Sequence, residues 1–534
     1  MNNDHGKKGL ARLTEEKGSV LLTTFLLITV LLILGAAFVV ATMNENRIAE
    51  ANRRYTQAFN IAEAGIERMI YYLKEDFAVD KDWSDGEVDG WTYDSTDVDA
   101  NNYFPFPDVS DAANAAYPPS TLGDGSYAIS LKSSADDEIW IRSVGTIGSI
   151  RQTIEVFVRV IALSPWDNAI FGGAGSSGAM VNGNVKIMGS VHILGNGLAD
   201  GDNAIDLGGT AELVGNNYDG LEADLDDRVP ELDTVLFNGE NVETLNAELR
   251  VKKGLVGLSG TSKVGNADAS GDGDKETVDG TYVTDGYNGT AGTTNVFSDN
   301  GSSEGYDLGD AVTFPSLNDS ISGYDDYYAY FSAEGYTLAA GELATVAALS
   351  GATPNFTYGN CATNCISMTG GKLYVKGKVY VNGGTLGITG STVEYTGSGT
   401  ILVSGDVTIN EDLITATDLD PVSGNQYENY PVHEVTGQKN VLAIMTPSDI
   451  EMGTGAGAAQ LDVMGLFFAE GEIKTAKQTD VMGSLVTNYF NVSNQVPSVW
   501  QVPDTSDNLP DGLITGDEIY LMRVISWRKI DNPT

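Results

Sequence analysis

The longest apolar stretch of the chain runs from Val20 to Thr42 and contains no charged residue. As an α-helix it would be about 35 Å long, enough to cross the hydrocarbon core of a membrane. Apolar and small residues then recur at steps of three and four positions as far as Leu73, so the helical pattern continues beyond this stretch. The pattern therefore predicts one long helix over residues 19–77, apolar in its first half and amphipathic in its second. The predicted packing face of the second half comprises Ile48, Tyr55, Phe59, Ala62, Ile66 and Ile70.

Period-two alternation of apolar and polar residues follows the helix. It occupies residues 138–161 on both sides of Gly148 and Ser149, which predicts a β-hairpin. Together with "GSYAISLKSS" (125–134), the hairpin predicts a three-stranded antiparallel meander within a small β domain over residues 78–166. The amphipathic face of the helix is expected to pack partly on this sheet.

A six-residue pattern, a glycine followed by alternating apolar positions, recurs within residues 167–500. "GNVKIM" (183–188) is followed directly by "GSVHIL" (189–194), and further copies occur at 209–214, 371–382, 399–410, 465–476 and 483–488. One such strand buries almost nothing alone, whereas stacked coils bury a continuous ladder of Val, Ile and Leu. The repeat predicts a parallel β-solenoid with long insertions, without indicating its handedness. Residues 501–534 are expected to form a C-terminal tail.

Composition restricts the possible partners. The chain has 534 residues and a formal net charge of -44. Such a charge would repel the phosphates of nucleic acid, so no nucleic-acid partner is expected. Because 42% of the residues are hydrophobic, the acidity indicates a folded acidic surface, which suits an extracellular location.

The residues in front of the apolar stretch resemble a targeting signal. Basic residues between positions 7 and 17 would stay on the cytoplasmic side of a membrane, and Gly18 and Ser19 lie at the junction. A short basic leader, a glycine and an unbroken apolar helix resemble the type III signal of type IV pilins. In that family a membrane peptidase cuts after the glycine and the helix is retained. The resemblance implies a prepilin leader over residues 1–18 and cleavage between Gly18 and Ser19.

The resemblance becomes narrower downstream. Residues 14–75 look like the N-terminal region of PilX-type minor pilins, and "AFNIAEAG", Ala58 to Gly65, is the most specific part. Major pilins carry a glutamate at the fifth mature position, where this chain has Thr23. The loss of this carboxylate favours a position at the tip of a filament. A single-pass protein that is never cleaved is the alternative.

Together with the repeat, the resemblance predicts a mainly β protein with a pilin-like long helix and small antiparallel sheet, followed by the parallel β-solenoid. It implies a minor pilin at the tip or in low copy, whose solenoid serves surface attachment or pilus assembly, and the sequence motifs predict no enzyme activity. The expected partners are the inner membrane, the prepilin peptidase, other pilins through the helix, and surface glycans or a host or abiotic surface. The expected location is the bacterial inner membrane, single-pass with a cytoplasmic N-terminus, and then the pilus or cell surface. A membrane-anchored extracytoplasmic scaffold and a surface carbohydrate-active enzyme are the alternatives.

Two motifs suggest local chemistry. Cys361 and Cys365 are too few for a zinc site, and outside the cytoplasm they suit a local disulfide, with two reduced thiols as the alternative. Asp268, Asp272 and Asp274 place carboxylates at positions that suit Ca²⁺. The residue at the position of the last EF-hand ligand is a threonine, so a solvated acidic turn is the preferred interpretation, and no other cofactor is expected.

Aromatic residues and histidines add little evidence for chemistry. Aromatic residues are concentrated in "GYDDYYAYFSAEGY" (323–336). The preferred interpretation of this segment is a short helix that covers the solenoid, and the alternative is a carbohydrate-stacking or adhesive patch. His5, His192 and His433 are far apart in the sequence, and no Ser-His-Asp order, HExxH motif or Walker glycine loop occurs.

Overall fold

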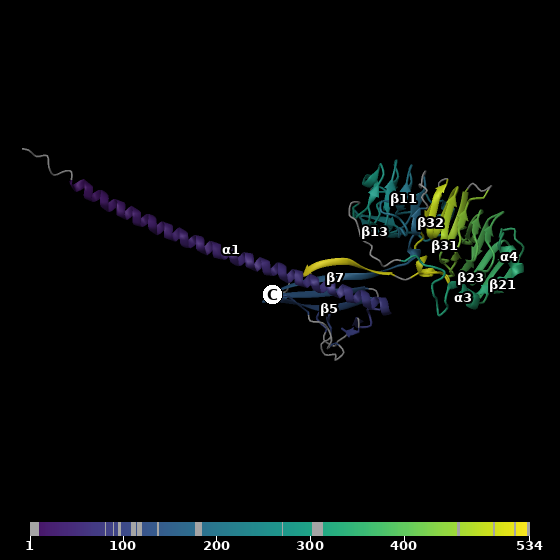
Figure 1. Cartoon of the computed structure of the whole chain (residues 1–534), viewed down its shortest axis with the longest axis horizontal. Coiled ribbons are helices and arrows are strands. Elements are labelled where there is room, and N and C mark those ends of the chain that lie inside the picture. The colour runs from purple at the N-terminus through teal and green to yellow at the C-terminus, as the bar shows by residue number, and fades with distance from the viewer. Residues whose placement is uncertain are drawn as a thin grey trace, which may run out of the picture. The chain divides into compact units, whose positions relative to one another are not determined.

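The structure is a computed structural model that describes residues 10–80, 82–88, 90–93, 98–107, 114, 120–135, 138–176, 184–269, 271–301, 313–455, 460–494, 497–516 and 519–530. It divides into two compact units. The first contains residues 1–162 and 520–534, and the second contains residues 163–519. The second unit is therefore an insertion within the first (Figure 1).

The first unit consists of one long helix and a six-stranded sheet. Helix α1 runs from Leu10 to Asp80, and the sheet order is β3-β5-β6-β7-β34, with β4 beside β5. The strands are β3 (Phe104–Phe106), β4 (Thr121–Leu122), β5 (Gly125–Ala135), β6 (Glu138–Ile147), β7 (Ile150–Leu163) and β34 (Ile519–Ile530), and a separate pair is formed by β1 (Glu87–Val88) and β2 (Trp91–Thr92). Strands β5, β6 and β7 are antiparallel, and Ile147 pairs with Ile150 across the predicted hairpin turn.

The C-terminal segment differs from the expectation. Residues 501–534 were predicted to be a tail, but β34 instead joins the sheet of the first unit beside β7. Figure 1 shows this last strand, drawn in yellow, alongside β7. The run "YLMRVISWRKI" (520–530), which is rich in β-branched and aromatic residues, is the strand signal that the sequence contained.

Helix α1 contacts the sheet through small residues. Ala58 and Ala62 are fully buried against β6, where a Cβ added to Gly145 would lie 2.5 Å from the Ala62 nitrogen and nearer still to the Ala58 carbonyl oxygen. One turn further along, a Cβ on Gly65 would lie 3.0 Å from the Tyr127 ring. The spacing of small residues in "AFNIAEAG" therefore lets the helix backbone touch the strand.

The predicted packing face is only partly buried by the sheet. Ala62 and Ile66 belong to the core of the first unit, and Phe59 and Ile70 are half-buried against it. Ile48 and Tyr55 are 61% and 50% exposed, so the sheet does not cover them and their part in helix packing stays a prediction. The helical period indicates one side of the helix, but the sheet reaches only as far as Ala58. The buried side also includes Ile61, Met69, Leu73 and Phe77, which pack on Ile139, Ile141, Ile154, Val156 and Val158 of the sheet.

The second unit is a stack of coils whose strands pair in parallel from one coil to the next. The coils of its first half contain β8 (Ile170–Ser176), β9 (Lys186–Met188), β10 (Val191–Ile193), β11 (Asn203–Leu207), β12 (Glu212–Gly215), β15 (Glu248–Val251), β16 (Leu255–Leu258), β17 (Lys263–Val264), β18 (Gly280–Val283) and β19 (Tyr287–Asn288). The coils of its second half contain β23 (Lys372–Val381), β24 (Leu386–Ile388), β25 (Val393–Thr396), β26 (Gly399–Val403), β27 (Val407–Ile409), β28 (Leu413–Thr415), β29 (Leu442–Thr446), β30 (Ile450–Met452), β31 (Gln460–Ala476), β32 (Gln478–Asn494) and β33 (Ser498–Trp500). The fold class predicted from the sequence, mainly β with a long helix, a small antiparallel sheet and a parallel stack with insertions, is confirmed.

The remaining elements of this unit lie outside the regular coils. They are η2 (Pro165–Asp167), α2 (Ala223–Asp226), the hairpin of β13 (Asp233–Phe237) and β14 (Glu240–Thr244), η3 (Gly292–Asn295), α3 (Tyr327–Glu334), β20 (Tyr336–Thr337), α4 (Ala340–Val346), β21 (Phe356–Asn360), β22 (Asn364–Thr369) and η4 (Ser506–Asn508). In α3, Tyr327 and Phe331 are buried in the same core as the coils. This agrees with the preferred interpretation of the tyrosine-rich segment as a covering helix.

The chain enters and leaves the stack at its middle. From β8 the first half builds outward through β10 and β15 to β18. The second half builds from β23 through β26, β29 and β31 to β32, which pairs with β8. One ladder of buried residues crosses this joint, formed by Ile401, Ile444, Phe467, Leu485, Ile170, Val191 and Leu249.

We expect Gly145→Ala to destabilise the first unit by about 1–3 kcal/mol, because the added methyl group overlaps the backbone of α1. Hydrogen exchange of the β5 and β6 amides measures the loss. Gly341→Ala in α4 is the control, since a methyl group added there would have no heavy atom within 4 Å. Unchanged exchange in Gly145→Ala would contradict the close contact between helix and strand.

Candidate functional site

The first half of α1 exposes a continuous apolar surface. Leu21, Phe25 and Phe38 are 74%, 72% and 75% exposed, and their apolar neighbours are similarly open. Among the described residues this is the one helix long and apolar enough to cross a membrane. An exposed apolar surface of this extent is typical of a helix that contacts a bilayer or the apolar faces of other helices.

Polar groups inside the apolar stretch are satisfied within the helix. The hydroxyl groups of Thr24, Thr29 and Thr42 donate to the carbonyl groups four residues earlier, at 2.7, 2.8 and 3.0 Å. The Thr23 hydroxyl donates to the Val20 carbonyl at 3.0 Å. The position that is a glutamate in major pilins is therefore an uncharged side chain bonded to its own helix.

The predicted processing site lies at the start of this helix. Gly18 and Ser19 belong to α1, which begins at Leu10. Residues 1–9 of the predicted leader, including His5, lie outside the described residues. Cleavage between Gly18 and Ser19 remains a prediction from the sequence.

A groove lies on the face of the sheet opposite α1. Along β6, Ile139 and Ile141 point to the helix, whereas the alternate residues Trp140, Arg142 and Val144 line the groove. Its volume is about 770 Å³. The other lining residues are Asp99, Asn101, Asn102, Tyr103, Lys132, Thr153, Glu155, Arg528 and Ile530.

Glu155 holds the walls of the groove together. Its carboxylate is 1% exposed and accepts hydrogen bonds from the Tyr103 hydroxyl, from Arg142 at 3.2 Å and from Arg528 Nε at 2.6 Å. Burial acts to raise the pKa of Glu155, but the Tyr103 hydroxyl and the two arginines outweigh it and the pKa is lowered. One buried carboxylate thus ties a loop, strand β6 and the final strand β34 to β7.

Aromatic and cationic side chains surround this carboxylate. The Arg142 guanidinium lies 3.6 Å from the Tyr103 ring centre and also pairs with Asp99. Trp140 stacks on Phe157 with ring centres 4.7 Å apart, and Arg528 lies 5.6 Å from the Trp140 ring centre. This site was not predicted from the sequence, because alternation assigns these residues to the outer face of the sheet and predicts that they are solvated.

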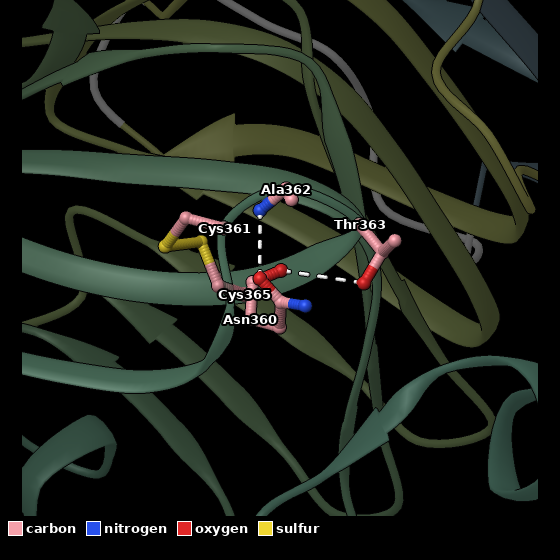
Figure 2. The surroundings of a disulfide bond; sticks show 5 residues. All are labelled: Asn360, Cys361, Ala362, Thr363 and Cys365. Atoms are coloured by element: carbon pink, nitrogen blue, oxygen red, sulfur yellow. Dashed lines mark hydrogen bonds between the residues drawn. A yellow bond between two sulfur atoms is a disulfide. The ribbon is translucent and has the colours of Figure 1, made fainter.

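Cys361, in the turn between β21 and β22, forms a disulfide with Cys365 of β22 (Figure 2). The turn also contains hydrogen bonds from the Ala362 amide to the Asn360 side chain and from the Thr363 hydroxyl to the Asn360 carbonyl group. Strand β22 then pairs antiparallel with β23. A cross-link across so short a loop contributes about 2 kcal/mol by the loop-entropy relation.

The predicted calcium ligands are not gathered into a site. Asp268, Asp272 and Asp274 lie between β17 and β18, where the Asp274 amide donates to Asp272 at 3.3 Å. Within the described ranges, no group of three His, Cys, Asp or Glu side chains is arranged to hold a metal ion. Burial, and then the Asp272 charge, raises the pKa of Asp274. This geometry agrees with an acidic turn.

The two described histidines lie in separate surroundings. His192 on β10 is buried, and burial followed by the charge of Arg250 lowers its pKa to about 3. His433 lies in the loop before β29 and contacts Asp418 at 3.1 Å. The structure does not join them in a common site with a nucleophile.

An acidic ladder follows the long coils of the stack. Asp462 on β31 pairs in register with Asp480 on β32, and the Asp462 amide donates to Asp412 at 3.2 Å. Burial, then the charges of Asp412 and Glu222, raises the pKa of Asp462 to about 7. Parallel in-register stacking brings these like charges together.

The first unit has a long helix that is apolar and uncovered in its first half and packs on an antiparallel sheet in its second, which is the arrangement implied by the resemblance to pilins. The family model of the PilX N-terminal region matches residues 17–67, so the resemblance to PilX-type minor pilins is confirmed over that segment. No curated protein sequence matches the chain. Among solved structures, the competence-associated pilin ComZ from Thermus thermophilus is 19% identical, with a TM-score of 0.49 over 89% of this chain and 97% of that one.

We expect Glu155→Gln to destabilise the first unit by about 3 kcal/mol at pH 7, because Arg142 and Arg528 lose their buried counter-charge. Since the folded pKa of Glu155 lies below its usual value of 4.5, its contribution is complete above pH 4.5 and disappears as the pH falls through the folded pKa. Urea unfolding at several pH values, with hydrogen exchange of β34, tests this. Glu138→Gln, which breaks the more exposed Arg159 pair, should change stability by less than about 1 kcal/mol.

Asp462→Asn should stabilise the protein at high pH, in contrast to the destabilisation expected for Glu155→Gln. Because the folded pKa of Asp462 is raised to about 7, its protonated form stabilises the stack at low pH, and this stabilisation is lost as the pH rises through 7. We expect the variant to melt roughly 2–4 °C higher than the parent at pH 8 and to show little difference at pH 4. A lower melting temperature at pH 8 would contradict like-charge repulsion in this ladder.

Proposed function

We propose that the chain is a minor subunit of a type IV pilus, placed at the tip or in low copy, which displays the stack of coils as a β-solenoid for surface attachment or pilus assembly. The observation that carries this proposal is the difference in burial between the two halves of α1. Its second half packs on its own sheet from Ala58 onward, and its first half leaves an uncovered apolar surface. The match of residues 17–67 to the PilX N-terminal family supports the same interpretation.

Two features favour a tip or low-copy position. Thr23 offers no carboxylate to neutralise the free amine of a neighbouring mature subunit. The inserted unit, residues 163–519, is more than twice as long as the pilin-type unit that carries it. A unit of this size would crowd a thin filament if it occurred at every position.

The proposed route begins in the bacterial inner membrane, with a single-pass helix and a cytoplasmic N-terminus. The prepilin peptidase cleaves after Gly18, and α1 then contacts the helices of other pilins through its open apolar half. Ile48 and Tyr55 extend this open surface toward the sheet. The proposed partners of the stack are surface glycans or a host or abiotic surface, and nucleic acid is not among them.

We propose a structural role without catalysis or a required cofactor. The acidic turn at residues 268–274 and the separate surroundings of His192 and His433 support it. A membrane-anchored scaffold outside any pilus is the second candidate, favoured by the continuity of α1 through Gly18. The state of the N-terminus distinguishes the two candidates.

Replacing Gly18 with leucine should block cleavage, because the glycine that precedes the cleaved bond is part of the signal that the peptidase recognises. We expect the parent chain from membranes to start at Ser19 and the Gly18→Leu chain to start at Met1 and to be absent from filaments. Intact mass and N-terminal sequencing provide the measurement. Gly35→Leu is the matched control, since Gly35 lies in the same apolar helix with open space around it and should leave cleavage intact. A parent chain that starts at Met1 would favour the scaffold, and normal incorporation of Gly18→Leu into filaments would contradict a requirement for cleavage after Gly18.

A further inference from the structure

The groove opposite α1 contains polar groups that the fold itself does not use. Among the described residues, the Lys132 ammonium has no carboxylate partner, and it lies 5.9 Å from the centre of the Tyr103 ring. The buried Nε of Arg142 has no hydrogen-bond acceptor. No acceptor for the Trp140 indole N–H lies within the described part of the chain, and this ring is half-buried at the same wall. Unused donors around an aromatic surface are the features of a ligand site.

The charge of the groove differs from that of the rest of the chain. Its lining has three cations, Lys132, Arg142 and Arg528, and two anions, Asp99 and Glu155, which leaves one net positive charge. The whole chain carries -44. Asp99 and Glu155 already pair with the two arginines, so the unpaired positive charge is that of Lys132.

The size and surface of the groove restrict the ligand further. A volume of about 770 Å³ suits a small molecule or a short oligomer. The half-buried Trp140 ring supplies aromatic surface with a polar tip, whereas Tyr103 is 5% exposed and its hydroxyl already donates to Glu155. The exposed Asn101 and Asn102 at the rim add amide groups that both donate and accept hydrogen bonds.

We propose that this groove binds a short oligosaccharide that carries one carboxylate, such as a hexuronic acid unit. The C–H face of a sugar ring packs on the half-buried Trp140 ring, and its hydroxyl groups bond to the Asn101 and Asn102 amides and to the Trp140 indole. Lys132 pairs with the sugar carboxylate. One net positive charge matches one carboxylate, whereas a nucleic-acid strand brings a negative charge with every nucleotide. The site lies in the pilin-type unit and is independent of the surface attachment proposed for the stack.

The test uses the full chain in detergent micelles and two disaccharides that differ only in a glucuronic acid or a glucose unit. Titration calorimetry measures both affinities. We expect the acidic disaccharide to bind about tenfold more tightly than the neutral one, as for one charge-assisted contact. Lys132→Gln should abolish this difference and leave the affinity for the neutral disaccharide unchanged. Lys74→Gln, an exposed lysine on α1, is the matched control and should preserve the difference.

A second variant separates the aromatic wall from the charge. Trp140→Phe keeps a ring but removes the indole N–H, so it should weaken both disaccharides by a similar factor of two to five, roughly the effect of one neutral hydrogen bond. Hydrogen exchange of β6 checks that the variants retain the sheet.

Three results would overturn the proposal. The first is the absence of binding of either disaccharide at roughly 10 mM, the range of very weak ligands. The second is an affinity for the acidic disaccharide that is the same in Lys132→Gln as in the parent. The third is displacement of the acidic disaccharide by a short single-stranded oligonucleotide at lower concentration, which would assign the groove to nucleic acid. None of these results depends on cleavage at Gly18 or on filament assembly.

Discussion

The parallel pairing of β8 with β32 is the contact on which the organisation of the chain depends. It joins the first and last coils of the inserted unit, so that Leu485 stacks on Ile170 although the two are far apart in the sequence. Next to this joint, the Trp166 indole donates to the Ile514 carbonyl at 2.6 Å, linking the incoming and outgoing segments. Because the chain enters and leaves at the same level of the stack, a large unit can be inserted between β7 and β34 without separating these neighbouring strands.

The sequence predicted the elements whose signals are local. The helix was expected over residues 19–77 and spans Leu10–Asp80, and the hairpin turns at Gly148 and Ser149 as expected. The six-residue pattern identified individual strands, but it did not indicate which coil neighbours which. Every unit has the same apolar spacing, so a coil that stacks on its successor and one that stacks on a segment three hundred residues away look alike. The order of the coils and the return of β34 follow from such distant pairings.

Among the functional residues, too, those with a local sequence signal were predicted and those that depend on distant contacts were missed. "AFNIAEAG" was the most specific segment of the helix, and the structure supplies the physical reason, since Ala58 and Ala62 allow backbone contact with β6 and Gly65 leaves room for the Tyr127 ring of β5. Periodicity showed the direction of the packing face but not the length of the sheet beneath it. The groove was missed for a further reason. Glu155 occupies an outward position of an alternating strand, and Tyr103 and Arg528, brought from distant segments, cover it together with Arg142 of the neighbouring strand.

The two halves of α1 differ in their surroundings, and this difference explains why one continuous helix is needed. Burying each large apolar side chain is worth about 1.5–3 kcal/mol, so the exposed residues between Val20 and Thr42 strongly favour a bilayer or other helices over water. The threonine hydroxyls in that stretch bond to their own helix and add little cost in an apolar environment. From Ala58 the same helix is held against its own sheet by backbone contact, which leaves it no freedom to turn its apolar half inward. A helix held in this way at one end must satisfy its other end outside the subunit, and that requirement makes association with a membrane or with other helices a consequence of the fold.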